Sequence, residues 1–210
     1  MSRIDARDAI LASALRLFGE RGFDGVATTE ILEGAGQRNQ TALQYHFGSR
    51  EGLYRAIVVE RLKAIDARRL AILDPGATGS ARPDLPTCLR ALVQPLLEQA
   101  LQGQGGADHV LFLRQYCARP GFSLGTVAQS LALPGMSLMI VALARHAPPP
   151  PGCPPDLAAS LMLQVTTTML AAWLQDGGAT FAADAFQAAA IESCRAIRRG
   201  LLAQAKAGAS

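Results

Sequence analysis

Residues 28–47, TTEILEGAGQRNQTALQYHF, contain two short segments with apolar residues at helical spacing, separated by a turn that contains Gly36. We expect the first helix over 28–35 and the second over about 40–46. Two helices of this length joined by a tight glycine-containing turn have the geometry of a helix-turn-helix. Because such a pair buries little surface by itself, it needs a third helix as a floor.

The preceding segment can supply that floor. Residues 5–21 carry Ile10, Ala14, Leu17 and Phe18 at the spacing of one helix face. We therefore expect a small three-helix core, closed by this stripe and by the apolar residues of the two short helices.

The second short helix carries a high density of polar side chains. They are Asn39, Gln40, Thr41, Gln44, Tyr45 and His46. Amide side chains pair with adenine edges, threonine contacts bases or thymine methyl groups, and tyrosine and histidine reach phosphates. A polar, solvated helix face explains the same residues, so this pattern alone leaves DNA binding open.

The segments ILASALRLFGERGFDGVATTEILEGAG (10–36) and NQTALQYHFGSREGLYRAI (39–57) resemble the DNA-binding head of TetR-family transcriptional regulators. The blocks FGERGFDG, ILxxAG and YHFGSREGL are specific in combination, and they cover about a quarter of the chain. The resemblance implies a helix-turn-helix head followed by a divergent helical domain whose last two helices dimerise.

The resemblance also implies a set of DNA-facing residues. They are Gln40, Thr41, Ala42, Gln44, Tyr45 and His46, together with Arg50 at the start of the next helix. We expect Gln40 and Gln44 to contact bases. We expect Tyr45, His46 and Arg50 to contact phosphates.

Two positions depart from the common family pattern. The turn from Gly36 to Asn39 is one residue longer than usual, and we expect Asn39 to take the N-cap place before the second short helix. Val26 and Ala27 stand where a capping residue is frequent. We expect Thr28 or Thr29 to cap the first short helix instead and to meet a phosphate there.

The composition agrees with a helical protein. Of the 210 residues 50% are hydrophobic, 18% charged and only 5% aromatic, and alanine and leucine are abundant. These values favour helices over strands. We predict an all-α fold of about nine helices, with a helix-turn-helix domain over 1–48 and a helical ligand-binding and dimerisation domain over 49–210. The net charge of +3 is too small to identify a partner.

Proline- and glycine-rich stretches mark the expected ends of the helices in the second domain. We expect helices over about 49–73, 87–102, 108–118, 123–146 (kinked at Pro134), 157–175 (capped by Asp156) and 181–206 (capped by Thr180), with connectors over 74–86 and 147–155. The four cysteines show no paired spacing, so we expect free thiols.

The helix over 157–175 is apolar almost all round. Leu161, Val165 and Ala172 lie on one side, and a second set of leucines lies on another. A second copy of the chain is the economical cover for the extra side, so we expect a homodimer formed by the last two helices. The alternative is a helix wrapped fully by its own domain. Because the segment carries several polar residues, we expect no membrane span.

The resemblance further implies that a small molecule binds the second domain and releases the DNA. Candidate pocket residues are Phe112, Gln115, Tyr116, Met136, Met139, Gln164, Thr167 and Trp173. Plain core packing is the alternative for each of them. Since these segments hold few charges, an apolar ligand is favoured.

Catalytic motifs and metal-ligand clusters are missing from the sequence, so we expect no enzyme activity, no metal and no cofactor. The charged start MSRIDARDAI lacks an export signal, and we expect a cytoplasmic protein. The predicted function is a homodimeric regulator, a repressor bound to a palindromic DNA operator. The alternatives are a transcriptional activator, or a helical enzyme or carrier with an incidental helix-turn-helix corner.

Overall fold

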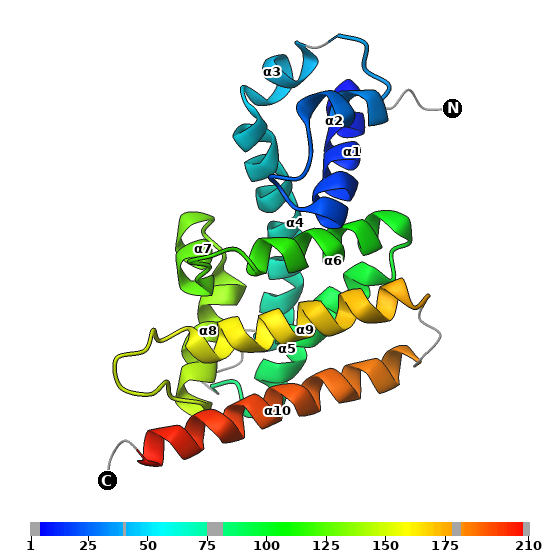
Figure 1. Cartoon of the computed structure of the whole chain (residues 1–210). Helices are drawn as coiled ribbons and strands as arrows, with labels where there is room; N and C mark the ends of the chain where they lie inside the picture. Colours follow the sequence, from blue (N-terminus) through cyan, green and yellow to red (C-terminus); the bar gives the residue numbers. More distant parts are fainter. Residues whose placement is uncertain (1–4, 40, 75–81, 178–181, 208–210) are drawn as a thin grey trace.

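Helices make up the whole regular structure of the described residues in the computed structural model (Figure 1). The structure describes residues 5–39, 41–74, 82–177 and 182–207. Residues 205–207 are described by their backbone only. Its ten helices are α1 (Ala6–Arg21), α2 (Thr28–Gly34), α3 (Ala42–Phe47), α4 (Arg50–Leu73), α5 (Leu85–Ala100), α6 (Gln104–Cys117), α7 (Leu124–Ser130), α8 (Pro134–His146), α9 (Leu157–Gln175) and α10 (Ala183–Ala207). The all-α prediction is confirmed, although the predicted number of helices was one too low.

The extra helix comes from the segment predicted as one kinked helix over 123–146. α7 ends before Ala132, which has a φ of 51°, and Pro134 is the first residue of α8. A proline ring pushes the residue before it into extended backbone, and Leu133 has a φ of −102° and a ψ of 91°. The proline therefore starts a new helix, at a position where its missing N–H costs nothing.

Two other helices begin earlier than predicted. The carboxylate of Asp84 accepts a hydrogen bond from the Thr87 backbone N–H at 2.9 Å, so α5 starts at Leu85. α6 starts at Gln104 instead of residue 108. α9 has the predicted bounds, and the predicted cap Thr180 of the last helix lies outside the described residues. The four cysteines are free, as predicted.

Asp156 precedes α9, but its carboxylate does not cap that helix through the expected side-chain bond. Instead Oδ2 accepts hydrogen bonds from the Gly125 N–H in the first turn of α7 and from the hydroxyls of Ser123 and Ser160. Asp156 is therefore the N-cap residue of α9 as predicted, but without a side-chain cap bond to that helix. Asp156 joins the start of α9 to the start of α7, because a long-range donor set competes with the local one.

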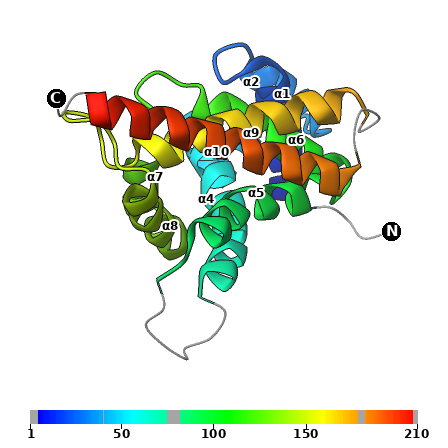
Figure 2. The same ribbon diagram turned by 90° about the horizontal axis from the view of Figure 1, so that it is seen from below.

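The molecule consists of a head, a connecting helix and a body. α1, α2 and α3 form the head, and α4 runs from it down into the body (Figure 1). α1 packs on α6, so the head rests on both α4 and α6. α9 and α10 pack against each other and cover the lower face, with α10 outermost (Figure 2).

His109 on α6 is fully buried, and neither ring nitrogen has a hydrogen-bond partner among the described residues. Burial, helped by the positive charge of Arg61, lowers its pKa from 6.5 to about 3. Below pH 6.5 the unfolded chain binds a proton at this residue and the folded chain does not, so acid favours unfolding. We expect the free energy of unfolding to fall by about 1.4 kcal/mol per pH unit through this residue between pH 6 and 4.

Urea unfolding at several pH values compares the native chain with His109→Leu. The variant should lose this share of the pH dependence. An equal slope in both proteins would contradict the assignment.

Candidate nucleic-acid interface

The head has its own apolar core, which fixes the position of α3. Ile10 and Phe18 of α1, Ile31 of α2 and Leu43 of α3 are buried together. α1 contacts both short helices, and α3 also packs on α4. This is the three-helix arrangement that the spacing of apolar residues predicts.

The turn after α2 is a Schellman motif centred on Gly36. The Gln37 N–H donates to the Leu32 carbonyl at 2.8 Å, and the Gly36 N–H donates to the Glu33 carbonyl at 2.9 Å. Gly36 has a φ of 65°, a conformation that residues with a Cβ rarely adopt. The motif therefore ends α2 sharply, as the sequence predicts.

The start of α3 differs from the prediction. The Asn39 side-chain oxygen accepts hydrogen bonds from the Thr41 backbone N–H at 2.9 Å and from the Thr41 hydroxyl at 2.7 Å. This asparagine turn delays the helix to Ala42, and Thr41 takes the N-cap position that was predicted for Asn39. The turn between α2 and α3 is thus longer than predicted. The side chains of Asn39 and Thr41 are hydrogen-bonded to each other. Gln40 lies outside the described residues.

α3 presents one polar face to solvent. Gln44 is exposed, and Tyr45 exposes 85% of its surface. His46 is half-buried, with its ring 5.0 Å from that of Tyr45. Ala42 exposes only 9% of its surface, so it offers little area for the predicted contact with DNA. Its small apolar side chain belongs to the core, on the same side as Leu43.

Arg50 does not reach outward as predicted. Its guanidinium donates a hydrogen bond to the Phe23 carbonyl and lies 4.4 Å from the centre of the Phe23 ring. Its carbon Cζ lies 5.7 Å from the centre of the Phe18 ring. These contacts hold the turn after α1 against α4 and stabilise the cation on aromatic rings, so the structure offers Arg50 partners other than the predicted phosphate.

The two threonines at the start of α2 do not cap it. Ala27 is the N-cap residue and has no acceptor in its side chain. The Glu30 carboxylate instead accepts from the Ala27 N–H at 2.7 Å and from Arg21 at 2.8 Å. Thr29 is exposed and Thr28 is half-buried, so phosphate contact by either remains a prediction while the predicted cap is wrong.

Sequence reasoning left one exposed cation out of the DNA-facing set. Arg38 lies in the turn directly before α3 and is exposed. No salt bridge is found for it within the described ranges, whereas Arg16 and Arg21 are paired with glutamates. Its position in the unusually long turn, where it replaces an apolar residue, could have indicated this exposed cation.

The three-helix head coincides with the part of the chain that matches a protein-family model. Residues 10–57 match the family model described as "Bacterial regulatory proteins, tetR family". Over these residues the head resembles the DNA-binding head of that family. The matched range begins inside α1 and ends inside α4, so it contains the whole core of the head.

Two curated relatives match about a third of this chain. The transcriptional repressor AcnR of Corynebacterium efficiens is 38% identical over 68 residues, which are 32% of this chain and 33% of AcnR. The match thus spans about a third of the length of the curated relatives.

Solved structures match nearly the whole fold. A crystal structure from Shewanella sp. PV-4, assigned to the tetR family, has a TM-score of 0.59 at 18% identity and covers 92% of this chain and 95% of its own. A second from Rhodococcus sp. has a TM-score of 0.55 at 19% identity, with coverages of 92% and 99%. At these identities the likeness shows a shared fold.

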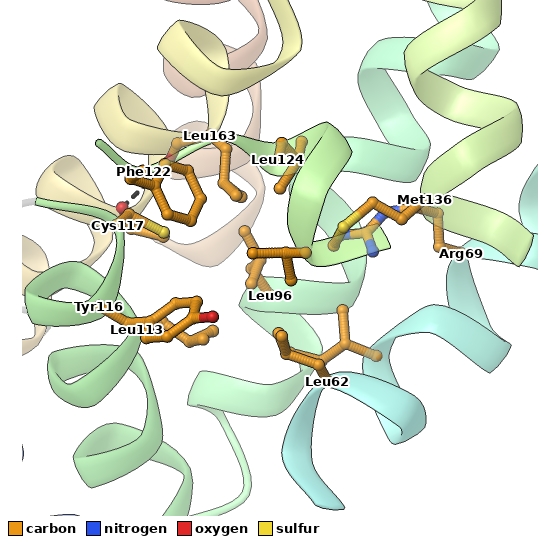
Figure 3. Close-up of a pocket in the computed structure, with 13 residues that line it drawn as sticks. Leu62, Arg69, Leu96, Leu113, Tyr116, Cys117, Phe122, Leu124, Met136 and Leu163 are labelled. Atoms are coloured by element: carbon orange, nitrogen blue, oxygen red, sulfur yellow. Dashed lines mark hydrogen bonds between the residues drawn. The ribbon is translucent and has the colours of Figure 1, made fainter. Parts of the chain in front are cut away.

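The body holds a small internal cavity of about 10 Å³, near the size of one water molecule (Figure 3). It lies between the tetR-type head and the lower helices, and α4, α5, α6, α7, α8 and α9 all contribute to its wall. Of the predicted pocket residues, Tyr116, Met136 and Thr167 line it. Arg69 also lines it and was missed.

The other predicted pocket residues lie elsewhere. Phe112 and Gln115 line a different hollow of about 250 Å³ at the junction of head and body. Met139 is part of the core, and the Gln164 amide donates to the Cys117 carbonyl at 2.9 Å. Trp173 packs on Phe186 with ring centres 5.4 Å apart. The three are absent from the cavity lining, and plain packing accounts for them.

Metal-ligating side chains do not cluster in the described ranges: no group of three or more His, Cys, Asp or Glu residues that could hold a metal ion is found there. Among the same ranges α9 is the one helix whose length and hydropathy would suit a membrane span, and half of that window is buried inside the protein. A core helix passes the same test.

Proposed function

We propose that this protein is a sequence-specific DNA-binding transcriptional regulator that acts as a repressor. The observation that carries the proposal is the exposed polar face of α3, which projects Gln44, Tyr45 and His46 from a head with its own core. A helix can enter the major groove, where glutamine pairs with adenine through two hydrogen bonds. The name of AcnR, a repressor, supports the same direction of control.

The proposed division of labour follows side-chain chemistry. Gln44, and Gln40 four positions before it in the sequence, read base edges, whereas Tyr45 and His46 contact phosphates. Arg38 replaces Arg50 as the proposed cationic phosphate contact, since Arg50 is engaged with Phe23. With few cations at the surface of α3, recognition depends on hydrogen bonding more than on a broad positive field.

Selection of bound duplexes from a random DNA pool tests the activity. We expect a palindromic motif, because a two-fold dimer presents two heads to two half-sites. Recovery of no motif over scrambled competitor would refute the proposal.

Gln44→Ala tests the base contact. We expect the variant to lose about 1–3 kcal/mol of binding free energy on the selected operator and to relax specificity at one base position in each half-site. Fluorescence anisotropy at fixed salt measures both effects. Gln129→Ala on α7 is the matched control, since Gln129 is exposed and lies outside the head. Unchanged affinity and specificity in Gln44→Ala would remove this residue from the interface.

We further propose that the regulator is a cytoplasmic homodimer joined through α9 and α10. On α9, Leu161 and Val165 remain half-buried and Ala172 is exposed. These three residues lie on the side of α9 that faces away from the buried Leu163 and Leu170. A second copy that covers this stripe would remove its apolar surface from water.

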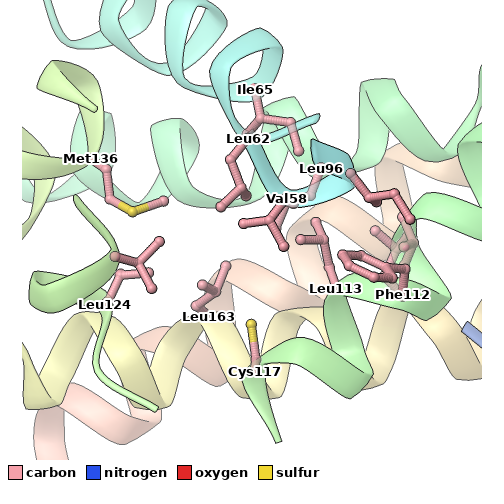
Figure 4. Packing of buried hydrophobic residues seen from close by; sticks show 14 of the residues in the cluster. Val58, Leu62, Ile65, Leu96, Phe112, Leu113, Cys117, Leu124, Met136 and Leu163 are labelled. Atoms are coloured by element: carbon pink, nitrogen blue, oxygen red, sulfur yellow. The ribbon is translucent and has the colours of Figure 1, made fainter. Parts of the chain in front are cut away.

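An apolar small molecule is the proposed signal. α4 and α6 line the internal cavity, and Leu62 of α4 and Leu113 of α6 lie in the same buried cluster (Figure 4). The head rests on these two helices. A ligand that needs a wider cavity would bind one arrangement of α4 and α6 better than another, and so would shift the spacing of the two heads. Release of the DNA follows if the favoured arrangement no longer fits both half-sites.

A further inference from the structure

One charged side chain, Arg69 of α4, lines the internal cavity among the described residues of its wall. The other lining residues are aliphatic, aromatic or neutral polar. Burial raises the pKa of the Cys117 thiol to about 12 and also raises the pKa of the Tyr116 hydroxyl, so both are uncharged at neutral pH. The lining is thus apolar apart from the Arg69 guanidinium, whose charge faces the Asp66 carboxylate at 3.8 Å.

The Arg69 guanidinium has an unused donor. The side chain exposes 1% of its surface, and Nε donates to the Ala91 carbonyl at 3.2 Å. Nη1 has no hydrogen-bond partner in the part of the chain that is described. The nearest carboxylate oxygen, Oδ1 of Asp66, lies 3.8 Å away and already accepts the Met136 N–H at 2.6 Å. A buried cation with an unmet donor favours an incoming anionic acceptor.

The cavity has a charged end and an apolar end. Arg69 and Met136 lie at one end, and Tyr116, Cys117 and Phe122 lie at the other (Figure 3). Leu96 lies between them. This order suits a molecule with an acid group at one end and a hydrocarbon body.

The apolar end of the cavity adjoins a depression on the surface. Tyr116, Phe122 and Val127 line both the cavity and a surface depression of about 200 Å³. They form the partition between the two spaces. The Phe122 ring is half-buried in the segment between α6 and α7, so its rotation would join a cavity of about 10 Å³ to that depression.

We propose that this cavity binds an apolar monocarboxylate, with the carboxylate on Arg69 and the hydrocarbon part directed toward Phe122. The planar guanidinium matches a carboxylate through paired hydrogen bonds. The proposal gives a chemical class to the effector of the proposed regulator and rests on that function only for its effect on DNA.

Arg119 is the competing cation, because it lines the surface depression. It is exposed, and its guanidinium lies 5.2 Å from the centre of the Tyr54 ring. An exposed cation gains little from an ion pair, since water already solvates it. The buried Arg69 therefore dominates the selectivity for an acid.

Calorimetric titration with octanoate and with 1-octanol tests the class of ligand. We expect the native protein to bind octanoate about 10- to 100-fold more tightly than the alcohol, the range for a hydrogen bond to a charged group. Arg69→Met should lose this preference, and Arg69→Lys should keep part of it. Equal binding of the two probes, or binding of neither, would overturn the proposal without any variant.

Two control variants locate the charge. Arg68→Met removes the same charge from the neighbouring residue, which is exposed and paired with Glu98 at 2.8 Å, and should keep the preference. Arg119→Met should also keep it. If the preference disappears in Arg119→Met and persists in Arg69→Met, the assignment to Arg69 is wrong.

Operator binding by the same samples separates this inference from the proposed function. Octanoate selectivity without DNA binding would leave the site standing and refute the regulator. DNA binding without octanoate selectivity would do the reverse. If both hold, octanoate should weaken operator binding by the native protein and not by Arg69→Met.

Discussion

Replacing Asp66 by alanine should lower the free energy of unfolding by about 3–5 kcal/mol, the usual cost of breaking a buried ion pair from one side. Asp66 is buried on α4, and its two carboxylate oxygens accept the Gly135 N–H at 3.0 Å and the Met136 N–H at 2.6 Å. It thereby caps α8 and lies beside Arg69. The variant leaves two backbone donors unsatisfied and a buried cation without its counter-ion. Urea unfolding followed by circular dichroism measures the loss.

The tight fit around Asp66 limits any repair by rearrangement. A Cβ on Gly135 would come within 2.6 Å of the Asp66 carbonyl oxygen, so the first turn of α8 lies directly on the backbone of α4. Solvent has no ready way to replace the lost carboxylate in such a contact.

A double-mutant cycle isolates the charge effect from the capping effect. Asp66→Ala combined with Arg69→Met should cost less than the sum of the two single variants, because the unpaired cation is removed as well. Additive costs, or a loss below about 1 kcal/mol for Asp66→Ala, would show that the pair contributes little.

The head was largely predictable because its signals are local. Helical spacing, Gly36 and the N-cap Ser49, which accepts the Gly52 N–H at 2.9 Å, are each read from neighbouring residues. The errors at the two N-caps are local choices between neighbouring side chains, whereas the error at Arg50 involves a distant partner. Arg50 binds a carbonyl 27 positions away, and no spacing rule in a single sequence reveals such a partner.

The cavity was less predictable for the same reason. Three predicted residues line it, but its one charge was missed because an arginine on a helix usually lies in solvent. One signal existed. Leu62, Ile65 and Arg69 are separated by three and four residues, so Arg69 continues the apolar stripe of α4. Its burial also needs α5, whose Ala91 carbonyl it binds, and this contact is invisible in the spacing.

The effector proposal and the dimer proposal depend on each other through α9. Leu163 and Thr167 line the cavity, whereas Val165 and Ala172 lie on the stripe that we propose a second copy covers, next to Leu161, which also packs on the cluster around Leu201. A change in the cavity can therefore reach the proposed interface within one helix. We therefore expect substitutions on the outer side of α9 to weaken dimer formation and DNA binding together.

Ala172→Asp should convert the protein to a monomer and weaken operator binding by about 10²- to 10⁴-fold, the gain expected from linking two binding modules. Ala172 is exposed in the single chain, so a carboxylate there costs the fold little. In a dimer it would place two uncompensated charges in an apolar interface. Sedimentation velocity and fluorescence anisotropy on the selected operator measure the two effects.

Val165→Asp provides a second variant on the same stripe, and Val141→Asp provides the control. Val141 lies on α8 with 51% of its surface exposed, away from the proposed interface. It should leave both pairing and DNA binding unchanged. A native protein that is monomeric at micromolar concentration would refute the dimer directly. If Ala172→Asp and Val165→Asp remain dimers with full operator affinity, the chains pair through another face, because an aspartate cannot be buried in a two-fold apolar contact without a partner of opposite charge.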